Sequence, residues 1–474
     1  MLSKIAWIFA GKWGYTVVSL LGFVVMLRFI SVESYGYYSV AAIMIILFEQ
    51  IGLDSFESSV IRGTDSRIDY WSAIVSSVTI SGFIAIISTI VMLMVYFFSE
   101  DKIIASVMGL MIPIIFIIAL TSVSKAFLLK NHHTKICAIN QTVSCLFGCV
   151  AGSVAAYDGY EYYALVIYHY ATSISLLILV LMALYKKTKI DDFSSFSVKG
   201  AKTYLSFQVV STYYTFLNIV SNRFDVLYIG FLSTPVAAGL FGFAKRLIQL
   251  AQEITSSSIE KAVLIFRKDS KNKVKLYNAT VFFQSLIIFV TMLSFASLAQ
   301  LIIPMLFGWQ WNDAVILIVV MSIGGIFRTL ASIDRAILVS KNRASDVLSG
   351  RYFDLFSGIL VFSILYYFDV LDAIAIALVF TLRQILSYFN IKIIAFKYRD
   401  RIMVNVSRCF SIMAIPFLVS VFICLISLVT IFSFSSHTST FNVIFLSVLG
   451  QVLGLLVCYL ALRNYIKKTY LGVS

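Results

Sequence analysis

The sequence predicts an all-α polytopic membrane protein of about 14 transmembrane helices, arranged as two pseudo-symmetric six-helix lobes plus two C-terminal helices. Composition is the first observation behind this fold class: of 474 residues, 60% are hydrophobic and only 13% are charged. A soluble core of this length cannot bury so much apolar surface. Second, apolar runs of ~20 residues, the length that crosses a bilayer as a helix, recur along the whole chain. The third is the placement of basic residues between these runs.

The apolar runs define the expected spans in order along the chain. The first run follows Lys4 and Lys12 and ends at no small-residue cleavage site, which indicates a retained span and not a signal peptide. No long polar segment separates the runs, so we expect no soluble domain. The expected helices cover residues 12–31, 37–61, 73–98, 103–128, 136–157, 162–185, 203–232, 236–266, 277–303, 314–338, 352–368, 371–396, 409–432 and 441–463.

Basic residues gather on one side of the membrane in this assignment. With a cytoplasmic N-terminus, the cytoplasmic loops and ends hold thirty of the 37 Lys and Arg residues, the opposite side holds Lys102, and helix interiors hold six. This asymmetry follows the positive-inside rule and predicts that both termini are cytoplasmic. Because topology accounts for most of the net charge of +14, we expect no nucleic-acid partner.

The two halves of the chain share a sequence pattern. A shift of 203 residues aligns "GYYSVAAIMIILFEQIGLDSFESSV" with "GLFGFAKRLIQLAQEITSSSIEKAV", so that Gly36 falls on Gly239, and a shift of 210 aligns "SKAFLLKNHH" with "DRAILVSKNR". Parallel six-helix repeats are a common transporter plan and favour alternating access to a cavity between two bundles. The expected domains are an N-terminal six-helix lobe at 1–190, a C-terminal six-helix lobe at 191–400 and two additional helices at 401–474.

Charged and polar side chains inside the spans form the candidate substrate site. The stretch "LNIVSNRFDVLYIGFLS" carries Arg223 and Asp225, which lie ~200° apart on a straight helix and so do not pair with each other. A charge at the bilayer centre costs at least ~2.5–3.5 kcal/mol and indicates a functional role. Because Arg presents a planar fork of donors that matches phosphate oxygens, these side chains suit an anionic substrate. The substrate-binding candidates are Arg223, Arg383, Arg328, Arg246, Lys245, Arg28 and Asn222.

Carboxylates in the same spans are candidates for coupling or charge relay. They either pass protons or hold a coupling cation, or they only neutralise nearby arginines. The candidates are Asp225, Glu49, Asp54 and Glu253. The alternative for Arg28, near a helix end, is snorkelling to the head groups. The six cysteines form no CxxC or CxxH pattern, and we expect no catalytic residue, no metal site and no cofactor.

Three stretches resemble prokaryotic polysaccharide exporters. "NRFDVLYIGFLSTPVAAGLFGFAKRL" resembles the start of their second half, with its polar Arg/Asp-containing helix, small-residue turn, glycine and aromatic. "PMLFGWQWNDAVILI" resembles their far-side connection between helices 9 and 10, and "GKWGYTVVSLLGFVVMLRFISVESYGYYSVA" is similar to their first two helices. The chain thus resembles the Wzx-type O-antigen and polysaccharide flippases, within the multidrug/oligosaccharidyl-lipid/polysaccharide superfamily.

This resemblance implies MATE-like lobes and a transport function without enzymatic activity. The cargo would be an undecaprenyl-diphosphate-linked oligosaccharide, an O-antigen or other surface polysaccharide repeat unit of lipopolysaccharide biosynthesis, moved from the cytoplasmic to the periplasmic leaflet of the bacterial inner membrane. Coupling to an H⁺ or Na⁺ gradient or to the membrane potential is implied. The implied partners are the undecaprenyl-diphosphate-linked glycan, membrane lipid, a polysaccharide polymerase and a chain-length regulator. Cavity arginines or lysines of relatives face the anionic head group, which fits Arg223 and its neighbours.

Three alternative functions stay open. A multidrug or cation antiporter of the same superfamily is expected to have twelve spans and a carboxylate in helix 1, and residues 12–31 contain none. A lipid II-type flippase has fourteen spans, and the sequence separates it poorly from an O-antigen flippase. An integral-membrane polysaccharide polymerase or ligase needs a site for acceptor chemistry, commonly in a large periplasmic loop, whereas the far-side loops here are only about four to ten residues long.

Overall fold

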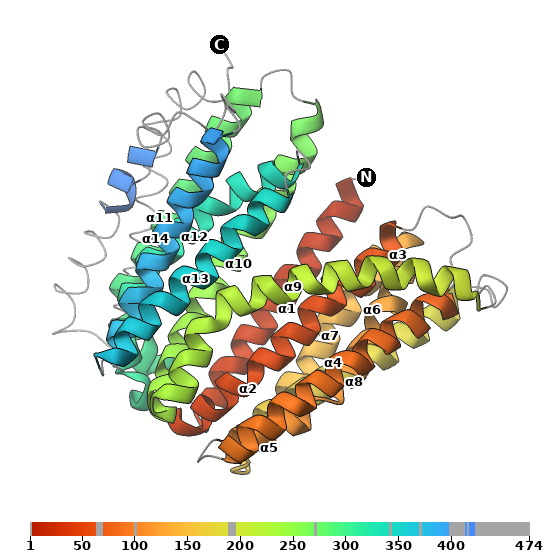
Figure 1. Ribbon diagram of the computed structural model, residues 1–474, viewed down its shortest axis with the longest axis horizontal. Coiled ribbons are helices and arrows are strands. Elements are labelled where there is room, and N and C mark those ends of the chain that lie inside the picture. Colours follow the sequence, from red (N-terminus) through yellow and green to blue (C-terminus); the bar gives the residue numbers. More distant parts are fainter. Residues whose placement is uncertain are drawn as a thin grey trace. The chain divides into compact units, whose positions relative to one another are not determined.

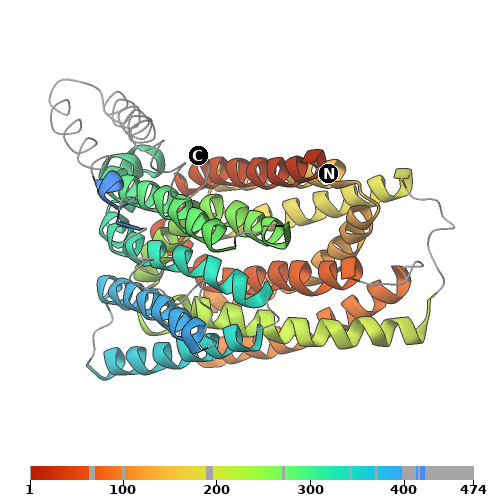
Figure 2. The same ribbon diagram turned by 90° about the horizontal axis from the view of Figure 1, so that it is seen from above.

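The regular elements that the structure describes are helices (Figures 1 and 2). The structure is a computed structural model, and its chain forms two compact units, Met1–Gly239 (unit 1) and Leu240–Ser474 (unit 2). The described residues are 2–62, 70–98, 102–187, 196–269, 273–340, 344–368, 372–397, 413–414 and 417–421.

Unit 1 is a bundle of apolar helices. Ser31 caps the N-terminus of α2 by accepting a hydrogen bond from the Ser34 backbone N–H (3.2 Å), and Ser197 caps α9 in the same way through Gly200 (3.2 Å). The elements of unit 1 are α1 (Leu2–Leu27), α2 (Val32–Ile51), η1 (Gly52–Glu57), α3 (Ser58–Arg62), α4 (Tyr70–Phe98), α5 (Lys102–Met111), α6 (Ile114–Lys130), α7 (Thr134–Tyr157), α8 (Tyr162–Lys187) and α9 (Val198–Leu232).

Two of the expected spans are interrupted. The expected helix 37–61 consists of α2, the π-helical segment η1 and α3, and the expected helix 103–128 is broken at Pro113 into α5 and α6. Proline removes a backbone donor and clashes with the preceding turn, which accounts for the second break. A π-helical segment often occurs at a functional site. A Cβ atom on Gly52 would lie 2.6 Å from Ser122 Oγ, so η1 packs closely against α6.

A close approach of backbone segments joins the start of α2 to the start of α10 within unit 1. Gly36 and Gly239, the two glycines that the internal repeat aligns, contact each other, because a Cβ atom on either would lie 3.2 Å from the backbone nitrogen of the other. Nearby, Ser39 Oγ donates to the Ala238 carbonyl at 3.3 Å. Any side chain larger than hydrogen at these two positions would force the backbones apart.

Unit 2 repeats the packing pattern of unit 1. In unit 2, helix α12 packs on α11, α13 and α14, and α13 packs on α14. In unit 1, the equivalent helix α6 packs on α4, α7 and α8, and α7 packs on α8. Trp311, in the far-side connection, is fully buried, with its ring centroid 4.4 Å from that of Phe243. The elements of unit 2 are the larger part of α10 (Pro235–Asp269), α11 (Lys273–Phe307), η3 (Trp309–Trp311), α12 (Ala314–Ser340), α13 (Ala344–Tyr367) and α14 (Ala373–Lys397).

The predicted all-α membrane fold is confirmed. Within the described ranges, nine helices are long and apolar enough to span a bilayer. The expected helix 441–463 and nearly all of 409–432 lie outside the described residues, so the count of fourteen stays a prediction. The expected lobe boundaries at 190 and 400 also stay a prediction; in the structure α9 packs on α2 and α4, and it belongs to unit 1.

Candidate functional site

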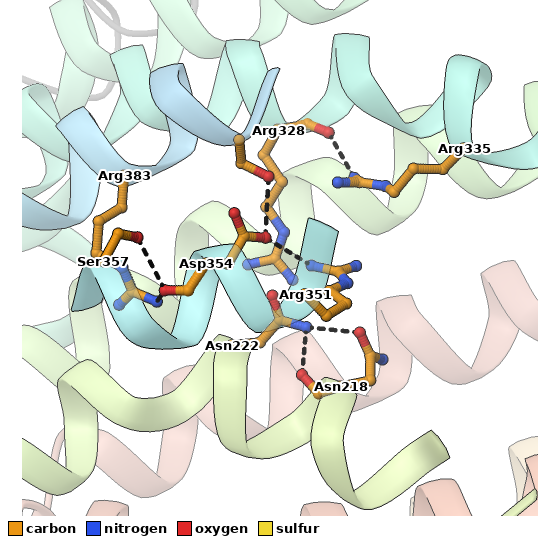
Figure 3. A network of polar contacts seen from close by, with 9 residues as sticks. Asn218, Asn222, Arg328, Arg335, Arg351, Asp354, Ser357 and Arg383 are labelled. Carbon is orange, nitrogen blue, oxygen red and sulfur yellow. Dashed lines mark hydrogen bonds and ion pairs between the residues drawn. The ribbon is translucent and has the colours of Figure 1, made fainter. Parts of the chain in front are cut away.

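Unit 2 contains a network of arginines around one carboxylate, which we call the arginine cluster. Asp354 Oδ2 accepts a hydrogen bond from Ser387 Oγ (3.0 Å) and lies 3.6 Å from Arg351 Nη1. The Asp354 carbonyl accepts a hydrogen bond from Arg383 Nη2 (2.9 Å). Figure 3 shows these contacts between α13 and α14, with side chains from α12 beside them. The members of the arginine cluster are Arg328, Arg335, Arg351, Arg383 and Asp354.

Arg383, predicted from sequence as a candidate, is the most enclosed arginine of the cluster. It is buried, and its guanidinium carbon lies 5.9 Å from the centroid of the Phe362 ring, a cation–π distance. Gly358 provides the space that this guanidinium occupies, because a Cβ atom there would lie 2.8 Å from Arg383 Cζ. An aromatic ring, a main-chain carbonyl and a glycine together therefore set the position of the charge.

Arg328 and Arg335 come from α12. Arg328, a predicted candidate, is half-buried, and its carbonyl accepts a hydrogen bond from Arg335 Nη2 at 3.0 Å. The charges of Arg335 and Arg351 repel each other. The cluster thus brings four arginine side chains together on α12, α13 and α14, and guanidinium groups gathered in this way suit an anionic ligand.

Two buried lysines extend the positive charge of unit 2. Lys245, a predicted candidate, is fully buried, and its Nζ lies 5.8 Å from the Phe241 ring and 5.2 Å from the Phe380 ring. Lys392 forms a buried ion pair with Asp334 (2.5 Å). Among the described side chains of α10 to α14 there are seven basic and three acidic groups. The basic ones are Lys245, Arg246, Arg328, Arg335, Arg351, Arg383 and Lys392, and the acidic ones are Asp334, Asp346 and Asp354.

Three predicted basic or polar candidates belong to unit 1, as does Asp225. In α9, Asn222 Nδ2 donates to the carbonyl and to Oδ1 of Asn218 (2.7 and 3.0 Å; Figure 3), and Asp225 is buried, with Oδ1 accepting a hydrogen bond from the Val226 backbone N–H (3.0 Å). Arg223 is half-buried in α9, and Arg28 is exposed at the end of α1. Exposure at a helix end fits the snorkelling alternative for Arg28.

The predicted carboxylates of unit 1 lie along α2 and η1. Asp54 Oδ2 accepts hydrogen bonds from Gln50 Nε2 (2.8 Å) and Thr215 Oγ1 (3.3 Å). Glu49 Oε1 lies 3.7 Å from His169 Nδ1. The side chain of Glu253, the fourth candidate, lies outside the described part of the chain. Asp54 is therefore held by neutral partners, and Glu49 faces a titratable one.

Three residues of the site, Arg351, Asp354 and Lys392, are not among the candidates that the sequence predicts. The predicted helix begins at residue 352, which leaves Arg351 in the preceding loop, whereas α13 begins at Ala344. The signal that could have found the site is the i,i+3 spacing of Arg351 and Asp354, which places opposite charges on one helix face. Lys392 and Asp334 lie in different helices, so only the packing of α12 on α14 reveals their pairing.

The described spans and the charged groups inside them define a polytopic helical membrane protein, and solved structures share its fold. The lipid II flippase MurJ, inward-closed, matches with a TM-score of 0.74 and 13% identity over 97% of this chain and 99% of that chain. An inward-facing MATE family multidrug resistance transporter of the MOP superfamily matches with a TM-score of 0.60 and 16% identity, over 82% of this chain and 94% of that chain. The Vibrio cholerae MATE transporter VcmN, in the bent form, matches with a TM-score of 0.53 and 12% identity, over 84% of this chain and 98% of that chain.

The family follows from the sequence match. The polysaccharide biosynthesis protein family matches residues 25–316, more than half of the chain, and the chain belongs to this family. No curated protein sequence matches the chain significantly. The predicted resemblance to polysaccharide exporters with MATE-like lobes is therefore confirmed, and the chain is a multi-pass membrane protein.

Proposed function

We propose that this chain is a flippase that carries an undecaprenyl-diphosphate-linked oligosaccharide, such as an O-antigen repeat unit, to the periplasmic leaflet of the bacterial inner membrane. Membership in the polysaccharide biosynthesis protein family and the fold shared with MurJ and MATE transporters support a flippase of the MOP superfamily. The positive-inside pattern supports cytoplasmic termini.

The arginine cluster is the observation that carries the choice of an anionic substrate. Arg328, Arg351 and Arg383 lie inside apolar spans, where each charge is costly unless it is compensated. The described side chains of α10 to α14 include seven basic and three acidic groups, so a diphosphate entering unit 2 would meet a positively charged region with donors in planar forks. A cationic drug would be repelled there, which disfavours the multidrug antiporter alternative.

A lipid II-type substrate is the second candidate. The fold match to the lipid II flippase MurJ extends over 97% of this chain, and both substrates are lipid-linked saccharides. The arginine cluster would contact the charged head group and leaves the glycan unspecified. The two candidates therefore differ at the sugar, and the assay must offer both.

Reconstitution tests the proposal directly. The protein is placed in proteoliposomes with a fluorescent polyprenyl-diphosphate oligosaccharide, and translocation is measured as loss of protection from a membrane-impermeant quencher. We expect translocation well above that of protein-free vesicles, faster for the diphosphate than for the monophosphate lipid. Lipid II offered in parallel decides between the two candidate glycans. An equal rate with and without protein for all three lipids would refute the proposal.

Arg383→Ala and Arg351→Ala test the site itself. A hydrogen bond to a charged group contributes ~1.5–3 kcal/mol, so each variant is expected to slow translocation roughly 10- to 100-fold, with Arg383→Lys intermediate. Lys199→Ala, which removes an exposed cation from α9, is the control and is expected to leave the rate unchanged. If both arginine variants carry substrate at the wild-type rate at matched expression, the cluster is not the head-group site.

A further inference from the structure

A histidine that the arginine site does not use bridges two side chains of α2. His169 lies in α8, inside an apolar span, and its Nε2 is 2.7 Å from the Tyr38 hydroxyl while its Nδ1 is 3.7 Å from Glu49 Oε1. The Tyr38 and His169 rings are stacked, with centroids 6.1 Å apart. Both ring nitrogens of one imidazole therefore face a partner able to exchange a proton.

The bridge joins two residues whose Cα atoms are well separated along α2. Tyr38 and Glu49 are eleven residues apart, which is close to three full turns, so they lie on the same face of α2. At 1.5 Å per residue, their Cα atoms are separated by about 16 Å along the helix. Neither side chain could reach the other alone, and His169 closes the gap. The path between the titrating atoms is much shorter than this Cα separation, because it consists of the 2.7 Å Tyr38–His169 contact, one imidazole ring and the 3.7 Å His169–Glu49 contact.

Adjacent side chains hold His169 in position. Tyr168 OH lies 3.5 Å from Ser19 Oγ on α1 and 3.9 Å from Cys145 Sγ on α7, and Tyr170 OH donates to the Leu110 carbonyl on α5 at 2.6 Å. The sequence Tyr-His-Tyr thus attaches α8 to three helices while directing the imidazole to α2. Only 14% of the His169 side chain is exposed, compared with 47% for Glu49, so the Glu49 end of the line is the open one.

The contacts suit either protonation state of the imidazole. When it is neutral with the proton on Nδ1, His169 accepts the Tyr38 O–H at Nε2, and Nδ1 faces Glu49 Oε1 at a distance longer than a hydrogen bond. When it is protonated, it forms an ion pair with Glu49. Helix α8 packs against α2, α5, α6 and α7. The titratable or charged groups on these helices are Glu33, Tyr35, Tyr37, Tyr38, Glu49, Lys102, Lys125, Lys130, Lys135, Cys137, Cys145, Cys149 and Tyr157, and Lys125 is paired with Glu57.

We propose that Tyr38, His169 and Glu49 form a proton relay that couples translocation to a proton gradient; this proposal rests on the proposed flippase function. In one passage, the Tyr38 O–H bond breaks as an N–H bond forms at Nε2, and the Nδ1–H bond breaks as an O–H bond forms on Glu49. Tyr38 regains a proton from a hydronium ion when its end of the relay is hydrated, and Glu49 releases its proton to water, so that one proton has moved from the Tyr38 end to the Glu49 end. Rotation of the ring or tautomer exchange resets the relay. Chains of such groups carry protons in membrane pumps and transporters.

The test separates coupling from translocation. In the proteoliposome assay, wild-type translocation is expected to rise several-fold when a pH gradient is imposed. His169→Asn and Glu49→Gln are expected to lose this response and keep the rate measured without a gradient. His132→Asn, at an exposed turn with φ of 67°, a backbone conformation that Asn tolerates, is the matched control and should keep the full response. A full pH response in His169→Asn would overturn the relay.

A second readout does not depend on any substrate. The chain has four histidines, so ¹⁵N-histidine spectra of the protein in nanodiscs allow His169 to be assigned by its loss in His169→Asn. Its ring ¹⁵N chemical shifts are expected to change in Glu49→Gln and in Tyr38→Phe, because each variant removes one partner of the ring, and unchanged shifts in both would overturn the relay even where translocation is absent. Failure of wild-type translocation combined with changed ring shifts would refute the flippase function and leave the relay standing as a proton site.

Discussion

Gly358 tests whether the position of the Arg383 guanidinium matters for transport. A Cβ atom at residue 358 would lie 2.8 Å from Arg383 Cζ and 3.1 Å from both Nε and Nη2. Carbon atoms in optimal contact are about 3.5–4.0 Å apart, so Gly358→Ala must displace the guanidinium by roughly 1 Å. Its hydrogen bond to the Asp354 carbonyl is 2.9 Å long, and a shift of that size carries it beyond hydrogen-bond range.

The expected effect is large on transport and small on folding. In the proposed site, a displaced guanidinium loses its hydrogen bond to the diphosphate, and loss of a hydrogen bond to a charged group costs ~1.5–3 kcal/mol, equivalent to roughly 10- to 100-fold in rate. The displaced atoms are the far end of a flexible side chain, so Arg383 moves aside without disrupting the helices, and overpacking costs at most ~1–3 kcal/mol. Translocation of the diphosphate-linked oligosaccharide is therefore expected to fall at least 10-fold, while Tm falls by only a few degrees.

Gly350, on the same helix, is the matched control. A Cβ atom there would meet Ile394 Cδ1 at 3.5 Å and Asn390 Nδ2 at 3.6 Å, which are ordinary contacts. Gly350→Ala adds the same methyl group and the same helix propensity, and we expect a rate close to wild type. A wild-type rate in Gly358→Ala would refute the reasoning, as would an equal loss in the two variants.

Two further predictions concern stability, measured by thermal unfolding in detergent. Lys392→Met removes the cation that lies 2.5 Å from the buried Asp334 carboxylate and is expected to lower the free energy of unfolding by ~3–5 kcal/mol. The double variant Lys392→Met with Asp334→Leu should restore most of this loss. Equal Tm values for wild type and the single variant would contradict the prediction. A Cβ atom on Gly36 would overlap the Pro235 carbonyl oxygen, so Gly36→Ala should lower Tm, whereas Gly82→Ala, which meets open space, should not. A similar Tm in both glycine variants would rule out the close approach.

Run length and charge asymmetry were enough to predict the fold class and most of the spans. Arg383 was predicted as a site residue because a charge in the middle of an apolar run is conspicuous. Arg351 was not, because it lies where polar residues make the helix start ambiguous, and the true start at Ala344 is set by packing. The sequence therefore predicts those site residues, such as Arg383, whose charge stands out within a single apolar run.

Contacts between distant helices could not be predicted in this way. The π-helical segment η1 forms where Gly52 meets Ser122 on α6, and neither residue alone indicates it. His169 and Glu49 are separated by 120 residues, so their proximity follows from α8 packing on α2. Periodicity identifies the face of a helix that is buried, but it does not identify the residue on the other helix that the face will meet.

The two repeats carry different charges on a common frame. The shift of 210 residues aligns Lys125 with Arg335, so both units have a basic residue at the same place near the end of equivalent helices. In unit 1 this base is neutralised by Glu57 on α2's continuation, at 3.1 Å. In unit 2 the basic residue is Arg335, which donates to the Arg328 carbonyl and lies near Arg351. The preceding residue also differs, because Ser124 of unit 1 aligns with Asp334 of unit 2. The two units thus keep the same helix pairs, while the charges at equivalent positions differ, as the proposed anion site in unit 2 and the proposed proton relay in unit 1 require.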